Sequence, residues 1–391
     1  MEQIINTIKN SEVIMGDNKS KKARIAINGF GRIGRAFLKV VLASDTLEVV
    51  AINDLGDIKN MAYLLNNDTV YKKNSVASFE VLVEEMGDTE KYLLIKNIFI
   101  QNKNQSGSII SVKKIEDKKI EFISQKDATL LPWKESNIDI VIESTGLFTS
   151  YDKANIHITC GAKRVIISAP AKEAKEGEDK SVIGETVLMS VNEDKLKTCN
   201  ITSNASCTTN ASSPLIAILD ETIGIEKAML NTVHAYTASQ SIVDGPNKKD
   251  YREGRAAAQN IVPSSTGAAI AVGKVFTQID GKFDGIAMRV PVPAGSIVDI
   301  TFIAKRNTTT EEINNILRNA SKEERWKIIF LASDEELVSS DIQGSHYASI
   351  ADLKMTRVVG GNLVKVLGWY DNEMGYTHTL VTHAEKVAKL I

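Results

Sequence analysis

The sequence has few cysteines, almost no net charge and no long apolar run, and each absence excludes a class of protein. Three cysteines (Cys160, Cys199 and Cys207) are too few and too odd in number for a disulfide framework, which favours a reducing compartment, by default the cytoplasm. A net charge of -2, from 47 basic and 49 acidic residues, provides no field for nucleic acid or an anionic membrane. No run reaches the roughly 18 to 20 apolar residues of a membrane helix. We therefore expect neither a nucleic acid nor a membrane as partner.

The remaining composition is that of a soluble globular protein. The 391 residues, 43% hydrophobic and 25% charged, are enough for two domains with separate cores. Residues 1–22 carry Glu2, Glu12 and Asp17 where a signal peptide would be apolar, so we expect an extension before the fold. The polar stretch 71–125 predicts short antiparallel strands, and the charged segment 172–181 predicts a solvated loop.

A glycine-rich turn follows the first strand-like run. Residues 23–54 have the order strand, GFGRIG, helix and strand, which predicts a βαβ unit. Gly29, Gly31 and Gly34 form a GxGxxG pattern, in which backbone approaches a pyrophosphate at a helix N-terminus. Asp54 ends the next strand, where a carboxylate can accept from a ribose hydroxyl and would repel a 2′-phosphate. The pattern predicts a dinucleotide site that prefers NAD to NADP.

Cys207 lies in SNASCTTN, between a predicted strand end and a predicted helix start. A thiol with a pKa of about 8.5 needs a stabilised anion to act as a nucleophile, and a helix dipole contributes only about 0.3 to 1 kcal/mol. A second positive group is therefore required. We predict that it is His234, although a histidine in an apolar strand is more often a core residue. Pro214 predicts a kink that leaves a short first turn to carry the dipole.

Beyond Cys207 the pattern changes to longer strand-like runs separated by amphipathic helices, which predicts an α+β domain. Arg289 lies in an apolar strand, where an unpaired cation is costly, so it is predicted to meet an anion. Residues 264–269, SSTGAA, could present amides to a phosphate. No CxxC or HxxxH pair occurs, so no metal is expected. The last segment, 382–391, predicts a helix that packs back on the first domain.

Ten motifs occur in order: NGFGRIGR, IND, STGLF, SAPAK, SNASCTTN, HAYT, DGP, STGAA, MRVPVP and WYDNEMGY. Together they closely resemble the phosphorylating glyceraldehyde-3-phosphate dehydrogenases, from residue 23 to the C-terminus. The resemblance implies an α/β Rossmann dinucleotide-binding domain and an α+β catalytic domain with a mainly antiparallel sheet. It places the Rossmann domain at residues 23–206 with 372–391, the catalytic domain at 207–371 and the extension at 1–22. It also implies a homotetramer.

The resemblance further implies that Cys207 attacks the aldehyde carbon of glyceraldehyde 3-phosphate and that His234 accepts the thiol proton. A thiohemiacetal and a thioester follow, NAD is reduced, and inorganic phosphate releases 1,3-bisphosphoglycerate. The implied substrate and phosphate contacts are Ser206, Thr208, Thr237, Arg252, Thr266, Gly267 and Arg289. The implied NAD contacts are Gly29, Gly31, Arg32, Ile33, Gly34, Asp54, Lys126, Thr145, Ser168, Asn372 and Tyr376.

Four residues depart from the family pattern. Lys126 stands where an arginine is common near the adenine, and Ala211 replaces a second cysteine that is not the nucleophile. Ile270 and Met374 replace a lysine and an aromatic residue, without an assigned consequence. Three other readings stay open: erythrose-4-phosphate dehydrogenase, a cysteine hydrolase or acyltransferase with a vestigial nucleotide fold, and an NAD-responsive binding protein.

Overall fold

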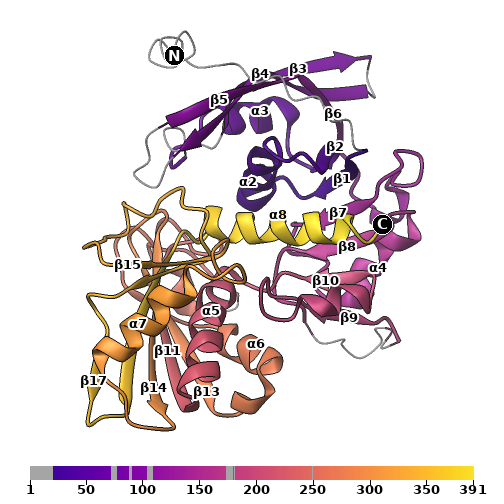
Figure 1. Ribbon diagram of the computed structural model, residues 1–391. Helices are drawn as coiled ribbons and strands as arrows, with labels where there is room; N and C mark the ends of the chain where they lie inside the picture. Colours follow the sequence, from indigo (N-terminus) through magenta and orange to yellow (C-terminus); the bar gives the residue numbers. More distant parts are fainter. Residues whose placement is uncertain are drawn as a thin grey trace.

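The computed structural model describes residues 21–71, 77–87, 90–103, 109–172, 179, 181–248 and 250–391. The predicted N-terminal extension lies outside the described residues except for its last two positions. Most of the predicted loop 172–181 lies outside them as well. The chain forms two sheets with helices around them (Figure 1).

The first sheet contains the predicted Rossmann unit. Its parallel strands run in the order β6-β2-β1-β7-β8-β10-β9. They span Lys118–Ile123, Leu47–Asn53, Ala23–Asn28, Ile140–Glu143, Arg164–Ile167, Ile201–Ser203 and Gly184–Thr186. The strands β1, β7 and β8 are almost wholly buried, as expected for parallel strands covered on both faces. The associated helices are α2 (Arg32–Val41), α3 (Ile58–Asn66) and α4 (Tyr151–Thr159), with the 3₁₀ turns η1 (Ala128–Leu130) and η2 (Glu193–Lys197).

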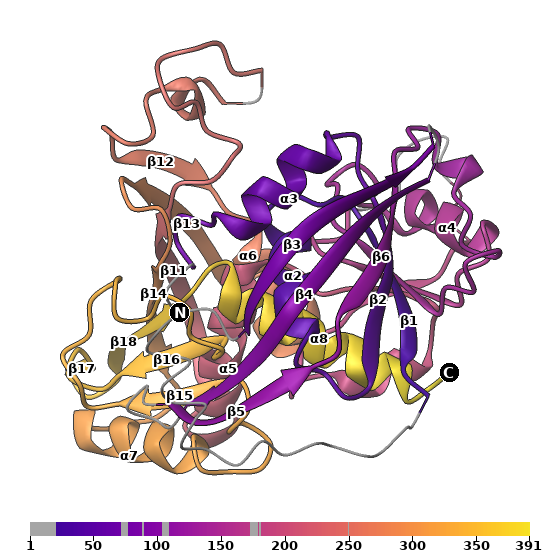
Figure 2. The ribbon, with the colours of Figure 1, turned by 90° about the horizontal axis from the view of Figure 1, so that it is seen from above.

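An antiparallel extension widens this sheet at one edge. β3 (Ala77–Met86) pairs with β4 (Glu90–Lys103), which also pairs with β5 (Ile109–Ile115) and β6. The predicted antiparallel strands are confirmed, but β4 has 14 residues and is not short. Figure 2 shows this long curved ribbon lying over the α2 side of the sheet.

The second sheet has the order β12-β13-β11-β14-β18-β16-β15, with β17 on β18. The strands span Val262–Ser265, Phe283–Val290, Ile225–Ala235, Ser296–Ala304, Leu363–Tyr370, Ser349–Asp352, Phe330–Ser333 and Arg357–Val359. The pairs β11–β13 and β15–β16 are parallel and the others antiparallel, so the predicted mainly antiparallel sheet is confirmed. The helices α5 (Cys207–Thr222) and α6 (Ala268–Val275) contact its strands, and α7 (Thr310–Ala320) contacts β15. The 3₁₀ turns η3 (Tyr251–Gly254) and η4 (Thr277–Ile279) complete this half.

The last helix, α8 (Met374–Ala388), begins before the predicted segment 382–391 and lies between the two halves (Figure 1). It packs against α2, as predicted. Its His383 Nε2 lies 2.9 Å from Thr202 Oγ1, and its Glu385 accepts a hydrogen bond of 2.6 Å from Ser44 Oγ. Among the described residues, no helix is both long and apolar enough to cross a membrane.

Candidate active site

The glycine-rich turn packs too closely for side chains at two positions. Gly29 has a φ of +96°, and a Cβ there would lie 2.6 Å from the Thr145 nitrogen. A Cβ on Gly34 would lie 2.2 Å from the Gly29 oxygen. Gly31 is the N-cap of α2 and makes no side-chain cap, so the amides of Arg32 and Ile33 in the first turn are open to an anion.

Asp54 joins this turn to the end of β2. Its Oδ2 accepts from the Phe30 nitrogen at 2.6 Å, and its Oδ1 accepts from the Gly56 nitrogen at 2.7 Å. A carboxylate has about four lone-pair sites, so capacity remains for a ribose hydroxyl. The exposed Lys126 follows β6, and Thr145 and Ser168 follow β7 and β8. All of these positions lie at the carboxyl edge of the parallel sheet, where dinucleotides bind in such folds.

The side chain of Arg32 is already engaged by two carboxylates. Its Nε lies 2.9 Å from Glu373 Oε1, and its Nη1 lies 3.2 Å from Asp68 Oδ2. Its guanidinium also lies 5.4 Å from the ring of Tyr71. Ile33 packs against the core. The predicted contribution of Arg32 and Ile33 to a dinucleotide site therefore falls on their backbone amides.

Cys207 and His234 are in contact, as predicted. The Cys207 Sγ lies 3.3 Å from His234 Nε2. β10 ends at Ser203, at the carboxyl edge of the first sheet, and Cys207 begins α5 just beyond it. Ser206 caps this helix, since its Oγ accepts from the Thr209 nitrogen at 3.1 Å. The thiol thus lies at a capped helix N-terminus beside the dinucleotide edge.

α5 runs through Pro214 as one 16-residue helix. The proline cannot donate to the Asn210 carbonyl, which instead lies 3.5 Å from the Ser213 hydroxyl. The helix therefore does not end at the proline, but the missing backbone bond to Asn210 is the usual cause of a bend, so the kink at Pro214 stays a prediction.

Burial raises the pKa of the Cys207 thiol, and the positive charge of Arg289 opposes this rise. Burial, together with Arg289, lowers the pKa of His234 to about 3. At neutral pH the resting pair is therefore a thiol and a neutral imidazole. Arg289 is the cation that lies beside this resting pair, and the role of His234 as the second positive group stays a prediction.

Strand register brings Arg289 to the histidine. β11 and β13 are parallel, and their pairing sets His234 directly beside Arg289. The Arg289 Nη1 lies 2.6 Å from His234 Nδ1 and 3.4 Å from the Ala235 oxygen. Its buried Nε has no hydrogen-bond partner within the described residues. This Nε is therefore free to donate to the anion that Arg289 is predicted to bind.

Tyr370 contacts the elements that carry the thiol and the histidine, and it is not among the predicted site residues. Its hydroxyl lies 2.9 Å from Thr208 Oγ1 and 2.8 Å from Thr232 Oγ1, and its ring meets His234 edge-on at 5.9 Å. The hydroxyl of Thr208, a predicted phosphate contact, therefore faces Tyr370 in this structure. The signal for Tyr370 in the sequence is its position as the second residue of the WYDNEMGY motif, at the end of an apolar strand.

Two predicted NAD contacts, Asn372 and Tyr376, lie where β18 leads into α8. The Asn372 Oδ1 accepts from the Gly295 nitrogen at 3.1 Å and from Ser296 Oγ at 3.2 Å. Its Nδ2 has no partner among the described residues and can donate to a carboxamide. The Tyr376 hydroxyl donates to the Ala205 oxygen at 3.1 Å, and Ala205 holds a φ of +54°. Tyr376 therefore fixes the strained residue that precedes the cap of α5.

Comparison with known proteins agrees with this geometry. Residues 206–372 match the family described as glyceraldehyde 3-phosphate dehydrogenase, C-terminal domain. Residues 23–105 and 95–151 match its NAD binding domain. The chain belongs to the glyceraldehyde 3-phosphate dehydrogenase family.

Relatives named glyceraldehyde-3-phosphate dehydrogenase align over nearly the whole chain. The protein of Streptomyces coelicolor is 42% identical over 361 residues, which cover 92% of this chain and 96% of the relative. The protein of Clostridium pasteurianum is 40% identical, with 94% and 99% covered. That of Priestia megaterium is 42% identical, with 93% and 98% covered. The family recognised in the motifs, the two-domain fold class and NAD as cofactor are thus confirmed.

The remaining residues that are predicted to bind phosphate contact other protein groups in this structure. The Thr237 hydroxyl lies 3.0 Å from Ser239 Oγ, just after β11. The side chain of Arg252 is 65% exposed and lies 3.6 Å from Asp250. Thr266 Oγ1 accepts from the Ala268 nitrogen at 3.2 Å, and Gly267 caps α6 without a side chain. Their roles as phosphate contacts stay predictions.

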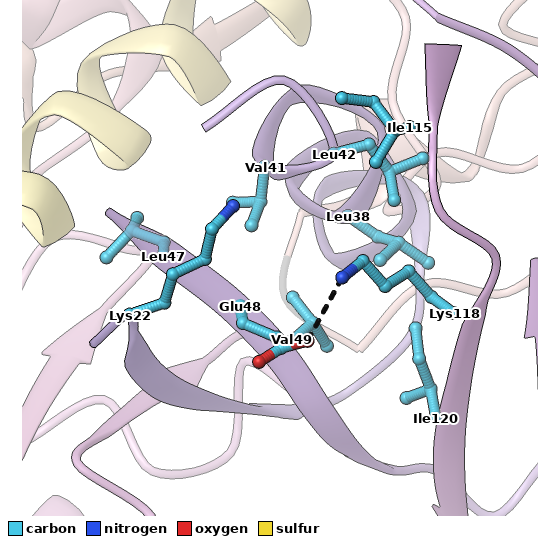
Figure 3. A pocket seen from close by; sticks show the side chains of 10 residues that line it. All are labelled: Lys22, Leu38, Val41, Leu42, Leu47, Glu48, Val49, Ile115, Lys118 and Ile120. Atoms are coloured by element: carbon cyan, nitrogen blue, oxygen red, sulfur yellow. Dashed lines mark hydrogen bonds and ion pairs between the residues drawn. The ribbon is translucent and has the colours of Figure 1, made fainter. Parts of the chain in front are cut away.

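No group of three or more metal-ligating side chains gathers anywhere in the described part of the chain. A small pocket lies at the amino ends of β1, β2 and β6, on the opposite edge from Cys207 (Figure 3). Its walls are mostly apolar, and two of its lining residues, Lys118 and Glu48, form an ion pair at 3.2 Å. This pocket is separate from the dehydrogenase site. Its lining residues are Lys22, Leu38, Val41, Leu42, Leu47, Glu48, Val49, Ile115, Lys118 and Ile120.

Proposed function

We propose that this family member is an NAD-dependent, phosphorylating glyceraldehyde-3-phosphate dehydrogenase with the Cys207–His234 pair at its centre. The observation that carries the proposal is the 3.3 Å approach of Cys207 Sγ to His234 Nε2. The pair lies at the N-terminus of α5, just past the carboxyl edge where Gly29, Gly34 and Asp54 form the dinucleotide turn. A nucleophile and a hydride acceptor at one edge suit aldehyde oxidation.

In this mechanism the Cys207 sulfur attacks the aldehyde carbon while His234 Nε2 takes the thiol proton. The adduct is a thiohemiacetal oxyanion, since His234 holds the thiol proton, and loss of a hydride from its carbon leaves a neutral thioester. NAD, when bound, would supply the hydride acceptor. A phosphate oxygen then attacks the thioester carbonyl, the carbon–sulfur bond breaks, and 1,3-bisphosphoglycerate leaves. His234 returns its proton to the sulfur.

Two groups of residues surround these steps. The phosphate groups bind through Arg289 and Arg252 and through the hydroxyls and amides of Ser206, Thr208, Thr237, Thr266 and Gly267. NAD would be held over the GxGxxG turn by the amides of Arg32 and Ile33. Lys126 would contact its adenine end, and Asn372 and Tyr376 its nicotinamide end, with Thr145 and Ser168 lining the cleft.

The test is NADH formation, followed by absorbance, from glyceraldehyde 3-phosphate with and without inorganic phosphate. We expect turnover to require both, with NADP much less effective and erythrose 4-phosphate a poorer substrate. Cys207→Ser should abolish turnover, and His234→Asn should lower kcat by about 10²- to 10⁴-fold, the usual contribution of a general base. Full activity of Cys207→Ser would refute the mechanism.

We also infer a cytoplasmic homotetramer, with a Rossmann domain of residues 23–206 and 372–391 and a catalytic domain of 207–371. The three free cysteines suit a reducing compartment. The side chains of Met229 and Ile286, on adjacent strands of the second sheet, are 59% and 46% exposed. The loop between β11 and β12 projects from the body with Tyr251 88% exposed (Figure 2). Exposed apolar side chains on a sheet and a projecting loop support subunit contacts.

A further inference from the structure

His234 Nδ1 lies within hydrogen-bond distance of two groups that require opposite protonation of it. Arg289 Nη1 lies 2.6 Å away and can only donate. The Ala235 oxygen also lies 2.6 Å away and can only accept. Nδ1 must be unprotonated to accept from Arg289 and protonated to donate to Ala235. The two hydrogen bonds therefore belong to different tautomers of the imidazole.

The choice at Nδ1 determines what Nε2 can do. A neutral imidazole has one proton, so accepting from Arg289 places that proton on Nε2, which faces the Cys207 sulfur at 3.3 Å. In that tautomer Nε2 cannot take the thiol proton. When Nδ1–H donates to Ala235, the lone pair of Nε2 is free. An imidazolium also needs Nδ1–H, so every state that has received the thiol proton requires Arg289 to leave Nδ1.

We infer that a phosphate group bound by Arg289 switches His234 from the resting tautomer to the one that acts as a base. The buried Arg289 Nε, unpartnered among the described residues, supplies a second donor for such an anion. When the guanidinium turns to the phosphate, Nη1 leaves Nδ1. The Nε2 proton passes to solvent and Nδ1 takes one from solvent, so the imidazole stays neutral. Arg289 thus acts as a positioning residue as well as a phosphate contact.

This inference rests on the proposed function, since it couples activation of the thiol to the phosphate-bearing substrate. It also predicts that phosphate binding changes the reaction rate of the Cys207 thiol in the direction opposite to that expected from the charge of Arg289 alone. Arg289 favours the Cys207 thiolate through its charge, so neutralising or removing that charge would slow or leave unchanged the reaction of the thiol. The tautomer switch predicts that the reaction becomes faster.

The test is iodoacetamide alkylation of Cys207 in the full chain, without NAD, at a fixed pH near neutrality. Inorganic phosphate is compared with chloride at equal ionic strength, and peptide mass spectrometry separates Cys207 from Cys160 and Cys199. A hydrogen bond from a charged donor biases an equilibrium by about ten-fold or more, so saturating phosphate should raise the alkylation rate about ten-fold. Phosphate that slows the reaction or leaves it unchanged would overturn the inference.

Two variants locate the effect. Arg289→Met, which removes the donor, should alkylate rapidly without phosphate and should not respond to it. Arg255→Gln removes one exposed arginine that pairs with Asp244 and does not contact His234, so it should keep the wild-type response. A slow, phosphate-insensitive Arg289→Met protein would show that Arg289 acts through its charge alone and would refute the switch.

A spectroscopic measurement on the wild type stands even if Arg289→Met fails to fold. Solid-state ¹³C–¹⁵N correlation spectra of histidine-labelled protein, with His234 assigned through His234→Asn, should show Nε2–H without phosphate and Nδ1–H with it. Nδ1–H in both states would refute the switch. Phosphate-insensitive alkylation with phosphate-dependent NADH formation would remove the switch and leave the proposed function. The reverse result would remove the function and leave the switch.

Discussion

At the scale of single residues, the site depends on a buried tyrosine, Tyr370, that is not among the predicted site residues. The Tyr370 hydroxyl joins Thr208 on α5 to Thr232 on β11, and these are the elements that carry Cys207 and His234. Its ring also lies against His234. Tyr370 therefore helps to hold the nucleophile and the base at their observed separation.

Tyr370→Phe should destabilise the protein, because the buried Thr208 hydroxyl loses this partner, whereas the Thr232 hydroxyl can still donate to the Ile297 oxygen at 3.2 Å. A buried polar group that loses its partner costs about 1 to 3 kcal/mol. Urea unfolding followed by fluorescence measures the loss as a lower midpoint. Tyr63→Phe is the matched control, since Tyr63 is 63% exposed and should show almost no change. Equal midpoints for the two variants would contradict the structural role of Tyr370.

The sequence allowed the candidate nucleophile and base to be predicted, but it did not allow prediction of the contacts that set their pKa values. Cys207 and His234 stand in motifs whose local pattern already predicts a strand end, a helix start and an apolar strand. The contact of Arg289 with His234 depends on the pairing of two strands across 55 positions of sequence. The lowered pKa of His234 follows from burial and from that contact, and neither can be read from the sequence alone.

At the scale of elements, buried ion pairs hold α2 beside the end of α3. Asp68 lies 2.7 Å from Lys39 Nζ and 3.2 Å from Arg32 Nη1, and Arg32 also pairs with Glu373 next to α8. Burial alone would raise the pKa of Asp68, but the hydrogen bond and charge of Lys39, with Arg32, lower it to about 2. Asp68 therefore joins the end of α3 to α2 as an ionised carboxylate, and Arg32 links α2 in turn to Glu373 at the start of α8.

This carboxylate should make stability depend on pH in the acid range. Its pKa is lower in the folded state than its ordinary value of 3.8, so the contribution is complete above about pH 4 and is lost as the pH falls toward 2. The shift corresponds to at most about 2 kcal/mol, and less in practice because burial also lowers the pKa of Lys39.

Asp68→Asn should therefore lower the free energy of unfolding near pH 6 and flatten its decline toward pH 2, measured by urea titrations across this range. Glu116→Gln, at an exposed position, should follow the wild-type curve. An unchanged slope in Asp68→Asn would show that other carboxylates cause the acid sensitivity.

Helices and strands with a strong hydrophobic periodicity are predicted correctly from the sequence. The extent of an element is predicted poorly where it depends on pairing or packing with residues far away in the sequence. The βαβ unit and the helix α7 follow directly from local patterns. β4 is longer than predicted because it pairs with β3, β5 and β6 along different parts of its length. α5 continues through Pro214 because its buried side packs on the second sheet and on α6.

At the scale of the whole molecule, the second sheet is buried against α5 through alternate residues of β11, and the other residues of this strand point away. Met229 and Ile286 are exposed large apolar side chains of this outward face. Such residues on a broad sheet are typical of an interface between subunits.

Met229→Lys and Ile286→Lys together should dissociate the proposed tetramer into smaller species, because two charges would be buried in the interface without partners. Sedimentation velocity measures the outcome. Leu130→Lys is the control, since Leu130 is 64% exposed on η1 in the other half of the molecule. A tetramer that persists in the double variant would place the subunit contacts elsewhere.

The parallel pairing of β11 and β13 makes catalysis depend on how accurately two strands are aligned. A slip of one residue would set Met288 or Val290 beside His234 and turn the guanidinium of Arg289 to the opposite face of the sheet. Gly285 permits the native alignment, because it is paired with Leu230 and a Cβ at its position would lie 2.5 Å from the Leu230 oxygen. The close approach of these two strands, four residues before Arg289, thus requires a residue with no side chain.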